Sequence, residues 1–375
     1  MDVKIVHVVE PLAGGIVTFL KSLVENLSSD SHIIVHGERV DVMPFTEVRR
    51  QFRHTNVRFI RWRSAQRSLR PVKDFRAFLE LYTILRRLQQ KKLVDAVHLH
   101  SSKSGFIGRL VCRVLNIQNV VYTPNGAPFM AGGSKASNYL YRQLEKLGSS
   151  FGGRIVCCSP SEQLAYEEAG MPAITINNGI AVAEPGLPAP DAGHKTRFRV
   201  VTSGRILSQK NPGLFNAIAG YFEEFPQFEF VWIGGGADAH LLTATNIKIT
   251  GWLSPAEAKA LLLTSDIYLS TAKFEGLSFS VLEALSLQKP VLLTDCIGNR
   301  DMVIQGLNGD LFTTSQQAIL KIVQYFNNRY MLPVMGGHSA FHCEDAFDIL
   351  QTKDRYRNLY SRGKQFSIDR EIILS

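Results

Sequence analysis

Short apolar runs alternate with longer segments of helical periodicity along most of the chain. The runs are mostly apolar, and their regular alternation with helical segments is typical of a parallel sheet. The sequence predicts strands at 3–9, 33–36, 57–61, 96–100, 119–123, 154–158, 198–203, 229–233, 247–250, 267–270 and 291–294. It predicts helices at 16–27, 75–90, 105–115, 138–148, 212–225, 255–264 and 279–287. This alternation favours the α/β class with doubly wound parallel sheets.

The alternation is interrupted once, near the middle of the chain. Residues 177–194 contain three prolines and three glycines and show no periodicity, which is typical of a linker. We therefore expect a first Rossmann-like domain at 1–180, a linker at 181–196 and a second Rossmann-like domain at 197–344. Residues 345–375 begin with a helical pattern up to about 362 that could cross back to the first domain. Ligands of two such domains bind at the carboxyl ends of the strands, in a cleft between them.

Length and composition exclude several classes of protein. A chain of 375 residues with 45% hydrophobic residues suits two globular cores. No apolar run reaches the roughly 18–20 residues that span a bilayer, and the first residues lack the basic region of a signal peptide. The five cysteines include no C-x-x-C pair, so neither a disulfide framework nor a zinc site is indicated. We expect a cytoplasmic protein.

The net charge of +9 is concentrated in one region. Between residues 49 and 76 there are nine arginines and one lysine but a single acidic residue, Asp74, and four more basic residues follow up to residue 92. Such a field attracts anionic lipid, lipid-linked phosphates or nucleic acid. A basic face that is simply solvated remains an alternative, and nucleic acid would explain the charge but none of the motifs below.

Two glutamates eight positions apart provide the strongest chemical signal, in the segment 274–284 (FEGLSFSVLEA). Glu275 lies in a glycine turn after a strand, where it could accept hydrogen bonds from sugar hydroxyls. Glu283 lies inside the following helix, where it could accept the hydroxyls of a ribose. Ser278 is the expected N-cap, so the backbone N–H groups near Gly276, Leu277 and Ser278 would face a diphosphate.

Two basic residues five positions apart follow the first strand of the second domain, in the segment 204–210 (GRILSQK). When a nucleoside diphosphate departs, negative charge develops on its oxygens. Fixed cations at Arg205 and Lys210 would stabilise that charge in the transition state.

The first domain has candidate residues at the ends of two strands. Gly14 and Gly15 follow the first strand and would let backbone amides approach a phosphate. His98 and His100 share one face of a later strand and are followed by Ser101 and Lys103. No third ligand stands at a suitable spacing from these histidines, so we expect no metal there. His100, Ser101 and Lys103 would instead line the cleft.

In order and setting, these motifs resemble those of the retaining glycosyltransferases of family 4, whose fold is called GT-B. The resemblance covers nearly the whole chain. It implies Glu275 at the donor sugar, Glu283 at the ribose of a UDP-type donor, and Arg205 with Lys210 at the diphosphate. It also implies two Rossmann-like domains that face each other across a cleft. No Asp-x-Asp motif occurs, so we expect no metal cofactor.

The chain departs from the family at one position. The segment 122–129 (YTPNGAPF) resembles a T-P-H-G element whose histidine hydrogen-bonds the donor sugar, but Asn125 replaces that histidine. Asparagine forms hydrogen bonds but does not exchange a proton near neutral pH. A same-face displacement needs no base here, because the departing phosphate can take the acceptor proton.

The motifs most resemble those of capsule and O-antigen enzymes. The resemblance implies transfer of a hexose or N-acetylhexosamine from a nucleotide sugar to a lipid-linked or saccharide acceptor. The basic region 49–92 would hold the enzyme at the inner face of the cell membrane. Two alternatives stay open: a UDP-sugar epimerase of the same fold, and a catalytically silent binding subunit.

Overall fold

The chain folds into two compact units. The computed structural model describes residues 2–38, 44–52, 56–66, 70–130, 134–181 and 197–373, with side chains up to 361. Unit 1 comprises Met1–Gly179 and Ile349–Ser375, and unit 2 comprises Ile180–Asp348. Most of the predicted linker, residues 182–196, lies outside the described residues.

Unit 1 contains a parallel sheet of seven strands in the order β3-β2-β1-β4-β5-β6-β7. Its strands are β1 (Lys4–Val9), β2 (Ser31–His36), β3 (Val57–Arg61), β4 (Ala96–His100), β5 (Val120–Thr123), β6 (Arg154–Cys157) and β7 (Ala173–Thr175). Its helices are α1 (Gly15–Asn26), α2 (Phe45–Gln51), α3 (Pro71–Gln90), α4 (Ser102–Val114), α5 (Lys135–Ser150), α6 (Pro160–Glu168) and α12 (Ile349–Ile373), with a 3-10 turn at Pro128–Met130.

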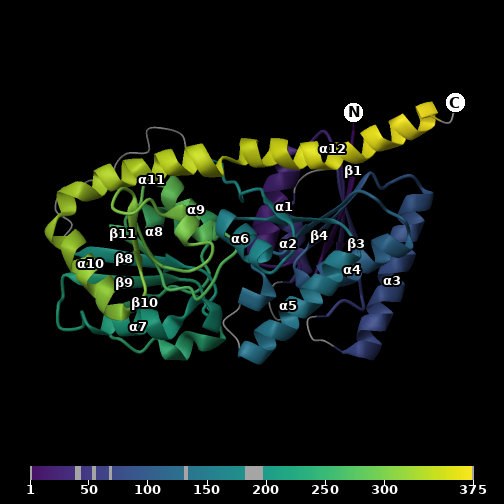
Figure 1. Cartoon of the computed structure of the whole chain (residues 1–375). Helices are drawn as coiled ribbons and strands as arrows, with labels where there is room; N and C mark the ends of the chain where they lie inside the picture. Colours follow the sequence, from purple (N-terminus) through teal and green to yellow (C-terminus); the bar gives the residue numbers. More distant parts are fainter. Residues whose placement is uncertain are drawn as a thin grey trace. The chain divides into compact units, whose positions relative to one another are not determined.

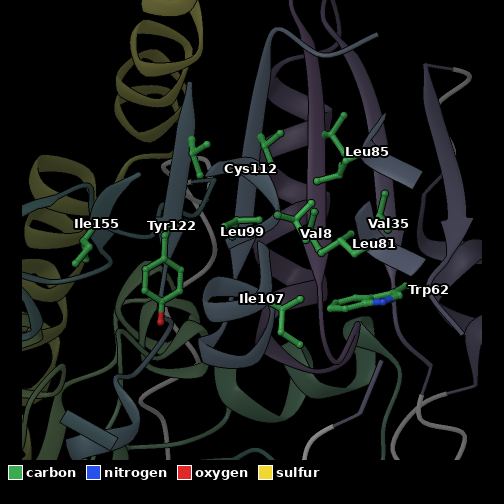
Figure 2. Packing of buried hydrophobic residues seen from close by; sticks show 14 of the residues in the cluster. Val8, Val35, Trp62, Leu81, Leu85, Leu99, Ile107, Cys112, Tyr122 and Ile155 are labelled. Atoms are coloured by element: carbon green, nitrogen blue, oxygen red, sulfur yellow. The ribbon is translucent and has the colours of Figure 1, made fainter. Parts of the chain in front are cut away.

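The two faces of this sheet have different compositions. One face carries aliphatic side chains such as Val8, Val35 and Leu99, which pack against Leu81 of α3 and Ile107 of α4 (Figure 2). Because successive strand residues point to opposite faces, the intervening positions of β1, β2 and β4 face the other way. That second face is covered by α1 and α12 (Figure 1).

Unit 2 contains a parallel sheet of six strands in the order β10-β9-β8-β11-β12-β13. Its strands are β8 (Phe198–Ser203), β9 (Phe228–Ile233), β10 (Ile247–Ile249), β11 (Ile267–Ser270), β12 (Val291–Thr294) and β13 (Gly309–Phe312). Its helices are α7 (Pro212–Gly220), α8 (Pro255–Leu263), α9 (Phe279–Ser286), α10 (Ser315–Asn327) and α11 (Leu332–Phe347). Short 3-10 turns lie at Ser208–Lys210, Ala237–Leu241, Arg300–Met302 and Arg329–Met331.

The predicted α/β class with two parallel sheets is confirmed. Several elements were not predicted from the pattern: α2, α6, β7, β13, α10 and α11. The helix predicted from residue 345 is wrong at its start, because α11 ends at Phe347 and Asp348 has an extended backbone (ψ 131°). The chain then enters α12, which packs against α1 and β4 of unit 1.

Candidate active site

The loop after β8 carries both predicted cations of unit 2. The Ile206 N–H donates to the Gly235 carbonyl oxygen (3.0 Å), and Trp232 Nε1 donates to the Gly204 oxygen (2.9 Å). Gly234 has a positive φ of 136°, and a Cβ there would collide with the Gly204 carbonyl oxygen. The glycine turn after β9 therefore lets the two loops pack directly. Arg205, which is half-buried, and Lys210 lie on this braced loop.

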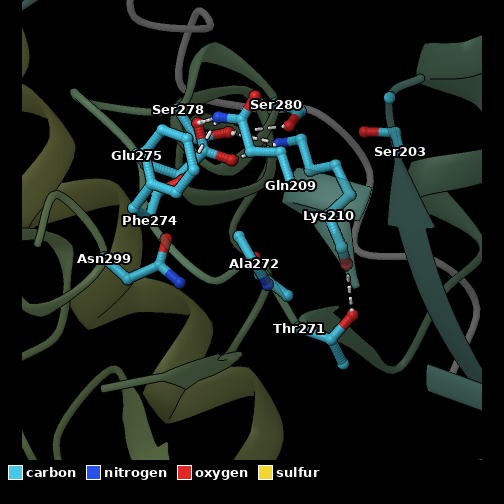
Figure 3. A network of polar contacts seen from close by, with 12 residues as sticks. Ser203, Gln209, Lys210, Thr271, Ala272, Phe274, Glu275, Ser278, Ser280 and Asn299 are labelled. Carbon is cyan, nitrogen blue, oxygen red and sulfur yellow. Dashed lines mark hydrogen bonds and ion pairs between the residues drawn. The ribbon is translucent and has the colours of Figure 1, made fainter. Parts of the chain in front are cut away.

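Lys210 reaches across to the loop after β11 (Figure 3). Its Nζ lies 2.8 Å from Oε1 of Glu275 and 3.3 Å from Oγ of Ser278. Gln209 adds a hydrogen bond from Nε2 to the Phe274 carbonyl oxygen (3.2 Å). Residues 65 to 68 positions apart in the sequence thus form one polar cluster at the carboxyl edge of the sheet.

Both members of the Lys210–Glu275 pair are shielded from solvent. Glu275 is only 8% exposed. Burial works against the charge on Lys210, but attraction to the Glu275 carboxylate and their hydrogen bond outweigh it, so the pKa of Lys210 is raised. Lys210 therefore remains a cation at any physiological pH. An anionic ligand that binds here would interact with the Lys210 ammonium group together with Glu275.

The start of α9 is suited to binding an anion. Ser278 is the N-cap, as predicted, but its side chain does not cap the helix, and the first turn contains no acidic residue. The Ser278 hydroxyl is instead within hydrogen-bond distance of Ser280 Oγ (2.9 Å) and of Lys210. Backbone N–H groups at a helix start carry partial positive charge and bind phosphate oxygens.

The turn that contains Gly276 and Leu277 is held by the loop after β12. The Glu275 N–H donates to the Ile297 carbonyl oxygen (3.1 Å). Gly298 has a φ of +83°, and a Cβ there would collide with the carbonyl oxygens of Glu275 and Gly276. Gly276 and Leu277 are buried. The turn is therefore fixed in position before any ligand arrives.

Glu283 lies on α9, two turns from the polar cluster. Its side chain is exposed, yet neighbouring protein atoms partly desolvate the carboxyl group and raise its pKa. In unit 2 the structure thus brings Lys210, Glu275 and Ser278 into contact and places Glu283 on the same helix that Ser278 caps.

The remaining predicted residues belong to unit 1, at the carboxyl edge of β1, β4 and β5. Gly14, with a φ of 59°, is the N-cap of α1, and Gly15 is its first residue. Ser101 Oγ donates to the Glu10 carbonyl oxygen (2.5 Å), and the Ser101 N–H donates to the Thr123 oxygen (3.0 Å). These contacts tie the three loops together at one edge of the sheet.

Lys103 and His100 are more enclosed than cleft-lining residues would be. The Lys103 side chain is 10% exposed and its Nζ lies 2.5 Å from Oδ1 of Asp74, which joins the first turns of α4 and α3. His100 is fully buried, and its Nε2 lies 3.1 Å from Nδ1 of His7. The structure thus places His100 within the core rather than at a surface.

Asn125 occupies a left-handed backbone position, with a φ of 57°. Asparagine tolerates this conformation better than most residues. Its Nδ2 donates to the Thr123 carbonyl oxygen (3.2 Å), and the next residue, Gly126, donates its N–H to Oε1 of Glu162 (2.8 Å). The sequence analysis did not identify Glu162. A signal was present, because Ser159 followed by Pro160, with a glutamate three residues after Ser159, is typical of a helix N-terminus.

The argument against a third ligand near His98 and His100 is wrong. One ring nitrogen each of His7, His98 and His100 lie within 4.8 Å of one another, and all three residues are buried. Spacing could not reveal His7, because it comes from β1, about 90 positions earlier, and β1 pairs with β4 in register. The absence of a metal cofactor in the reaction stays a prediction.

Within the described part of the chain, no helix is both long and apolar enough to cross a membrane.

Comparison with known proteins places both units in described families. Residues 190–332 match the family model for glycosyl transferases group 1, and residues 14–179 match the model for the glycosyl transferase 4-like domain. Together the two matches cover most of both units.

Two curated relatives are informative. The chain is 25% identical over 320 residues to the Escherichia coli UDP-Gal:alpha-D-GlcNAc-diphosphoundecaprenol alpha-1,3-galactosyltransferase, covering 78% of this chain and 81% of that protein. It is 26% identical over 257 residues to the Escherichia coli O-antigen biosynthesis glycosyltransferase WbnH, covering 66% of this chain and 71% of that protein.

A solved structure supports the fold. Anabaena HepE, crystallised in complex with UDP and glucose, superposes with a TM-score of 0.75 at 16% identity, over 96% of this chain and 100% of that one. At this identity the likeness shows the fold alone, and it confirms the predicted GT-B fold.

Proposed function

Because the chain belongs to the group 1 glycosyltransferases with a family 4-like N-terminal domain, we propose that it transfers a hexose or N-acetylhexosamine from a UDP-linked donor. The acceptor is a lipid-linked or saccharide intermediate of surface polysaccharide, as the names of its relatives suggest. The anomeric configuration of the donor is retained. A nucleotide-sugar epimerase and a silent binding subunit are not favoured by these relatives.

The observation that carries the proposal is the contact of Lys210 with Glu275 beside the start of α9. The donor diphosphate lies against the α9 N-terminus, where backbone N–H groups and the Ser278 hydroxyl donate to its oxygens. Lys210 and Arg205 neutralise the charge that grows on the leaving diphosphate. The proposal requires no metal ion, because Lys210, Arg205 and the start of α9 would together neutralise the charge.

Glu275 and Glu283 orient the two ends of the donor. Glu275, held beside Lys210, accepts hydrogen bonds from hydroxyls of the transferred sugar. Glu283 accepts the ribose hydroxyls from its position on α9. Charge-assisted hydrogen bonds of this kind are strong and directional.

In the proposed reaction, Asn125 forms hydrogen bonds and transfers no proton. Its amide cannot act as a base near neutral pH, so the departing phosphate takes the proton of the attacking hydroxyl. The C–O bond to the phosphate breaks as the new glycosidic bond forms on the same face. Gly14 and Gly15 at the start of α1 and Ser101 before α4 would serve the phosphate and the acceptor, whereas Lys103 is held by Asp74.

The exposed face of α3 attaches the enzyme to anionic lipid at the inner face of the membrane. Val72, Phe75 and Leu79 are 71%, 62% and 46% exposed, and they alternate with exposed Lys73 and Arg76 on the same helix. Apolar side chains flanked by cations are typical of helices that lie in the membrane interface. Further exposed basic residues follow at the end of the helix: Arg86, Arg87, Lys91 and Lys92.

A donor screen tests the proposed reaction. Purified protein is incubated with UDP- and GDP-sugars and a lipid-diphosphate-linked saccharide acceptor, and nucleotide release and product are measured. We expect UDP release that depends on acceptor, a product whose new linkage keeps the α configuration of the donor by NMR, and no loss of rate in EDTA. Conversion of UDP-N-acetylglucosamine to an epimer without acceptor would instead identify an epimerase.

A further inference from the structure

The second face of the unit 1 sheet contains a run of buried histidines. His7 of β1, His32 of β2 and His98 and His100 of β4 are each at most 1% exposed. They point to one face because they occupy alternate strand positions: the register pairs His7 with His98 of β4, and His32 of β2 pairs with Ile5, two residues before His7. The equivalent positions on the opposite face are aliphatic.

Hydrogen bonds fix the proton positions along part of this cluster. The Leu27 carbonyl oxygen can only accept, so Nε2 of His32 donates to it (3.1 Å). Nδ1 of His32 must then accept from Nε2 of His7 (3.1 Å). This leaves the Nδ1 lone pair of His7 directed at Nε2 of His100 (3.1 Å).

The buried histidines are neutral, and one of their ring nitrogens has no hydrogen-bond partner among the described residues. Burial lowers the pKa of His100 to about 3, and burial together with neighbouring histidines lowers the pKa of His7 and His98. All three rings are therefore neutral. Nδ1 of His100 has no hydrogen-bond partner among the described residues, and burying such a group without a partner destabilises the fold.

We propose that His7, His98 and His100 form a binding site for a transition-metal ion of the zinc class. One nitrogen from each ring lies within 4.8 Å of the others. At Zn–N distances of about 2.0–2.1 Å, two nitrogens on one tetrahedral ion are about 3.3 Å apart, close to the 3.1 Å between His7 Nδ1 and His100 Nε2. Neutral imidazole is the form that binds metal.

The groups around the three rings can orient them for this role. The Nε2–H of His7 donates a hydrogen bond to Nδ1 of His32, as the second ring N–H of a metal-binding histidine usually does to an acceptor. The proton of His100 can move to its unpartnered Nδ1, which frees Nε2 without loss of a proton. His98 contacts Tyr360 OH through Nδ1 (2.6 Å) and Thr123 Oγ1 through Nε2 (2.8 Å), so one contact persists when the other nitrogen binds the ion.

The ion would fasten the C-terminal helix α12 to the sheet of unit 1. Tyr356 and Tyr360 of α12 lie over the cluster, and the Tyr356 hydroxyl is within hydrogen-bond distance of Thr123 Oγ1 (3.2 Å). The Tyr360 hydroxyl lies 2.6 Å from Nδ1 of His98. The site belongs to unit 1 and serves the fold, so it is separate from the metal-independent chemistry proposed for unit 2.

Metal analysis of the full-length protein tests the site. The chain is expressed in zinc-supplemented medium, freed of any affinity tag, desalted into chelator-free buffer and analysed for metal content. We expect about one zinc ion per wild-type chain and a Tm about 5–10 °C above that of chelator-stripped protein. His7→Gln should lower the zinc content to background, whereas His36→Gln, which removes a buried histidine outside the trio on β2, should retain it.

Cobalt substitution keeps the test decisive even if His7→Gln does not fold. Wild-type protein loaded with Co²⁺ should show the visible d–d bands of a tetrahedral site. Wild-type protein that retains no zinc and gives no such bands overturns the proposal, and so does a folded His7→Gln that binds zinc as the wild type does. In either case the four histidines form only a hydrogen-bonded core network.

Discussion

In the proposed reaction, Lys210 neutralises the negative charge that develops on the leaving diphosphate. It is held by Glu275 at 2.8 Å and by Ser278 at 3.3 Å, so its ammonium group is positioned before the donor binds. Preorganised charge of this kind lowers the barrier because no reorganisation is needed during the reaction. Most of its effect should therefore appear in kcat.

Lys210→Ala should lower kcat by about 100- to 1,000-fold, with a smaller change in the KM for donor. The measurement is initial-rate UDP release at saturating acceptor. Lys321→Ala is the matched control, because Lys321 also pairs with a carboxylate of unit 2 (Asp310, 3.0 Å) but lies outside the site loops. A Lys210→Ala enzyme with wild-type kcat would remove Lys210 from the mechanism.

Glu283 should give donor binding a dependence on acidic pH. Partial burial raises its pKa above the ordinary 4.5, so it becomes protonated, and stops accepting both ribose hydroxyls, at a higher pH than an exposed glutamate. As the pH is lowered, UDP-sugar affinity should therefore begin to fall at a higher pH than an unshifted glutamate would allow. A UDP-sugar is used for the titration because a terminal phosphate ionises near pH 6. Glu283→Gln should bind more weakly and without this acidic limb; an unchanged pH profile in Glu283→Gln would contradict the assignment.

At the scale of elements, the helices of unit 1 are joined by a buried ion pair. Arg109 of α4 donates to Glu145 of α5 (3.1 Å), both side chains are less than 5% exposed, and Tyr122 of β5 donates to the same carboxylate (2.9 Å). The Arg109 guanidinium also lies over the Tyr122 ring. The pair therefore fixes α4 and α5 against the sheet.

Glu145→Leu should lower the free energy of unfolding of unit 1 by about 3–5 kcal/mol, because it leaves the Arg109 charge buried without its partner. Urea denaturation measures this, and Arg109→Leu combined with Glu145→Leu should recover part of the loss. The exposed ion pair between Arg300 and Asp295 (2.9 Å) serves as the control. Asp295→Ala should lower the free energy of unfolding by no more than about 1 kcal/mol. Equal costs at the two sites would show that burial does not determine the effect.

Local sequence patterns predicted the strands, helices and turns that have a clear periodicity or a glycine turn. They did not predict contacts that depend on pairing between distant strands. Strands β1, β4, β8 and β11 and the turn at Glu275 followed from apolar runs and glycines. The contact of Lys210 with Glu275 could be anticipated, because carboxyl ends of neighbouring parallel strands meet at one edge. The contact between His7 and His100 could not be anticipated, because residue spacing does not reveal the register between strands that are far apart in the sequence. The burial of Lys103 depends likewise on Asp74 of another helix.

At the scale of the whole molecule, the positive charge is unevenly distributed. Basic residues gather between 49 and 92 of unit 1, and on α3 they accompany exposed Val72, Phe75 and Leu79. Long-range attraction would bring the enzyme to an anionic surface, and the apolar side chains would then enter the interface.

Phe75→Ser with Arg76→Gln should reduce co-sedimentation with phosphatidylglycerol vesicles by about tenfold at low salt, and raised salt should weaken wild-type binding. Leu320→Ser is the control, because Leu320 of α10 is an equally exposed apolar side chain (69%) in unit 2. Unchanged vesicle binding by the α3 variant, with folding confirmed, would remove this face from membrane attachment.

Binding of UDP tests the central claim most directly, since it requires neither the right sugar nor the right acceptor. Isothermal titration should show one UDP bound per wild-type chain, with affinity at least tenfold weaker in Arg205→Ala and in Lys210→Ala and unchanged in Lys321→Ala. If millimolar UDP gives no binding to the wild type, or if Arg205→Ala and Lys210→Ala bind as well as the wild type, then the loops after β8 and β11 do not hold a nucleotide sugar.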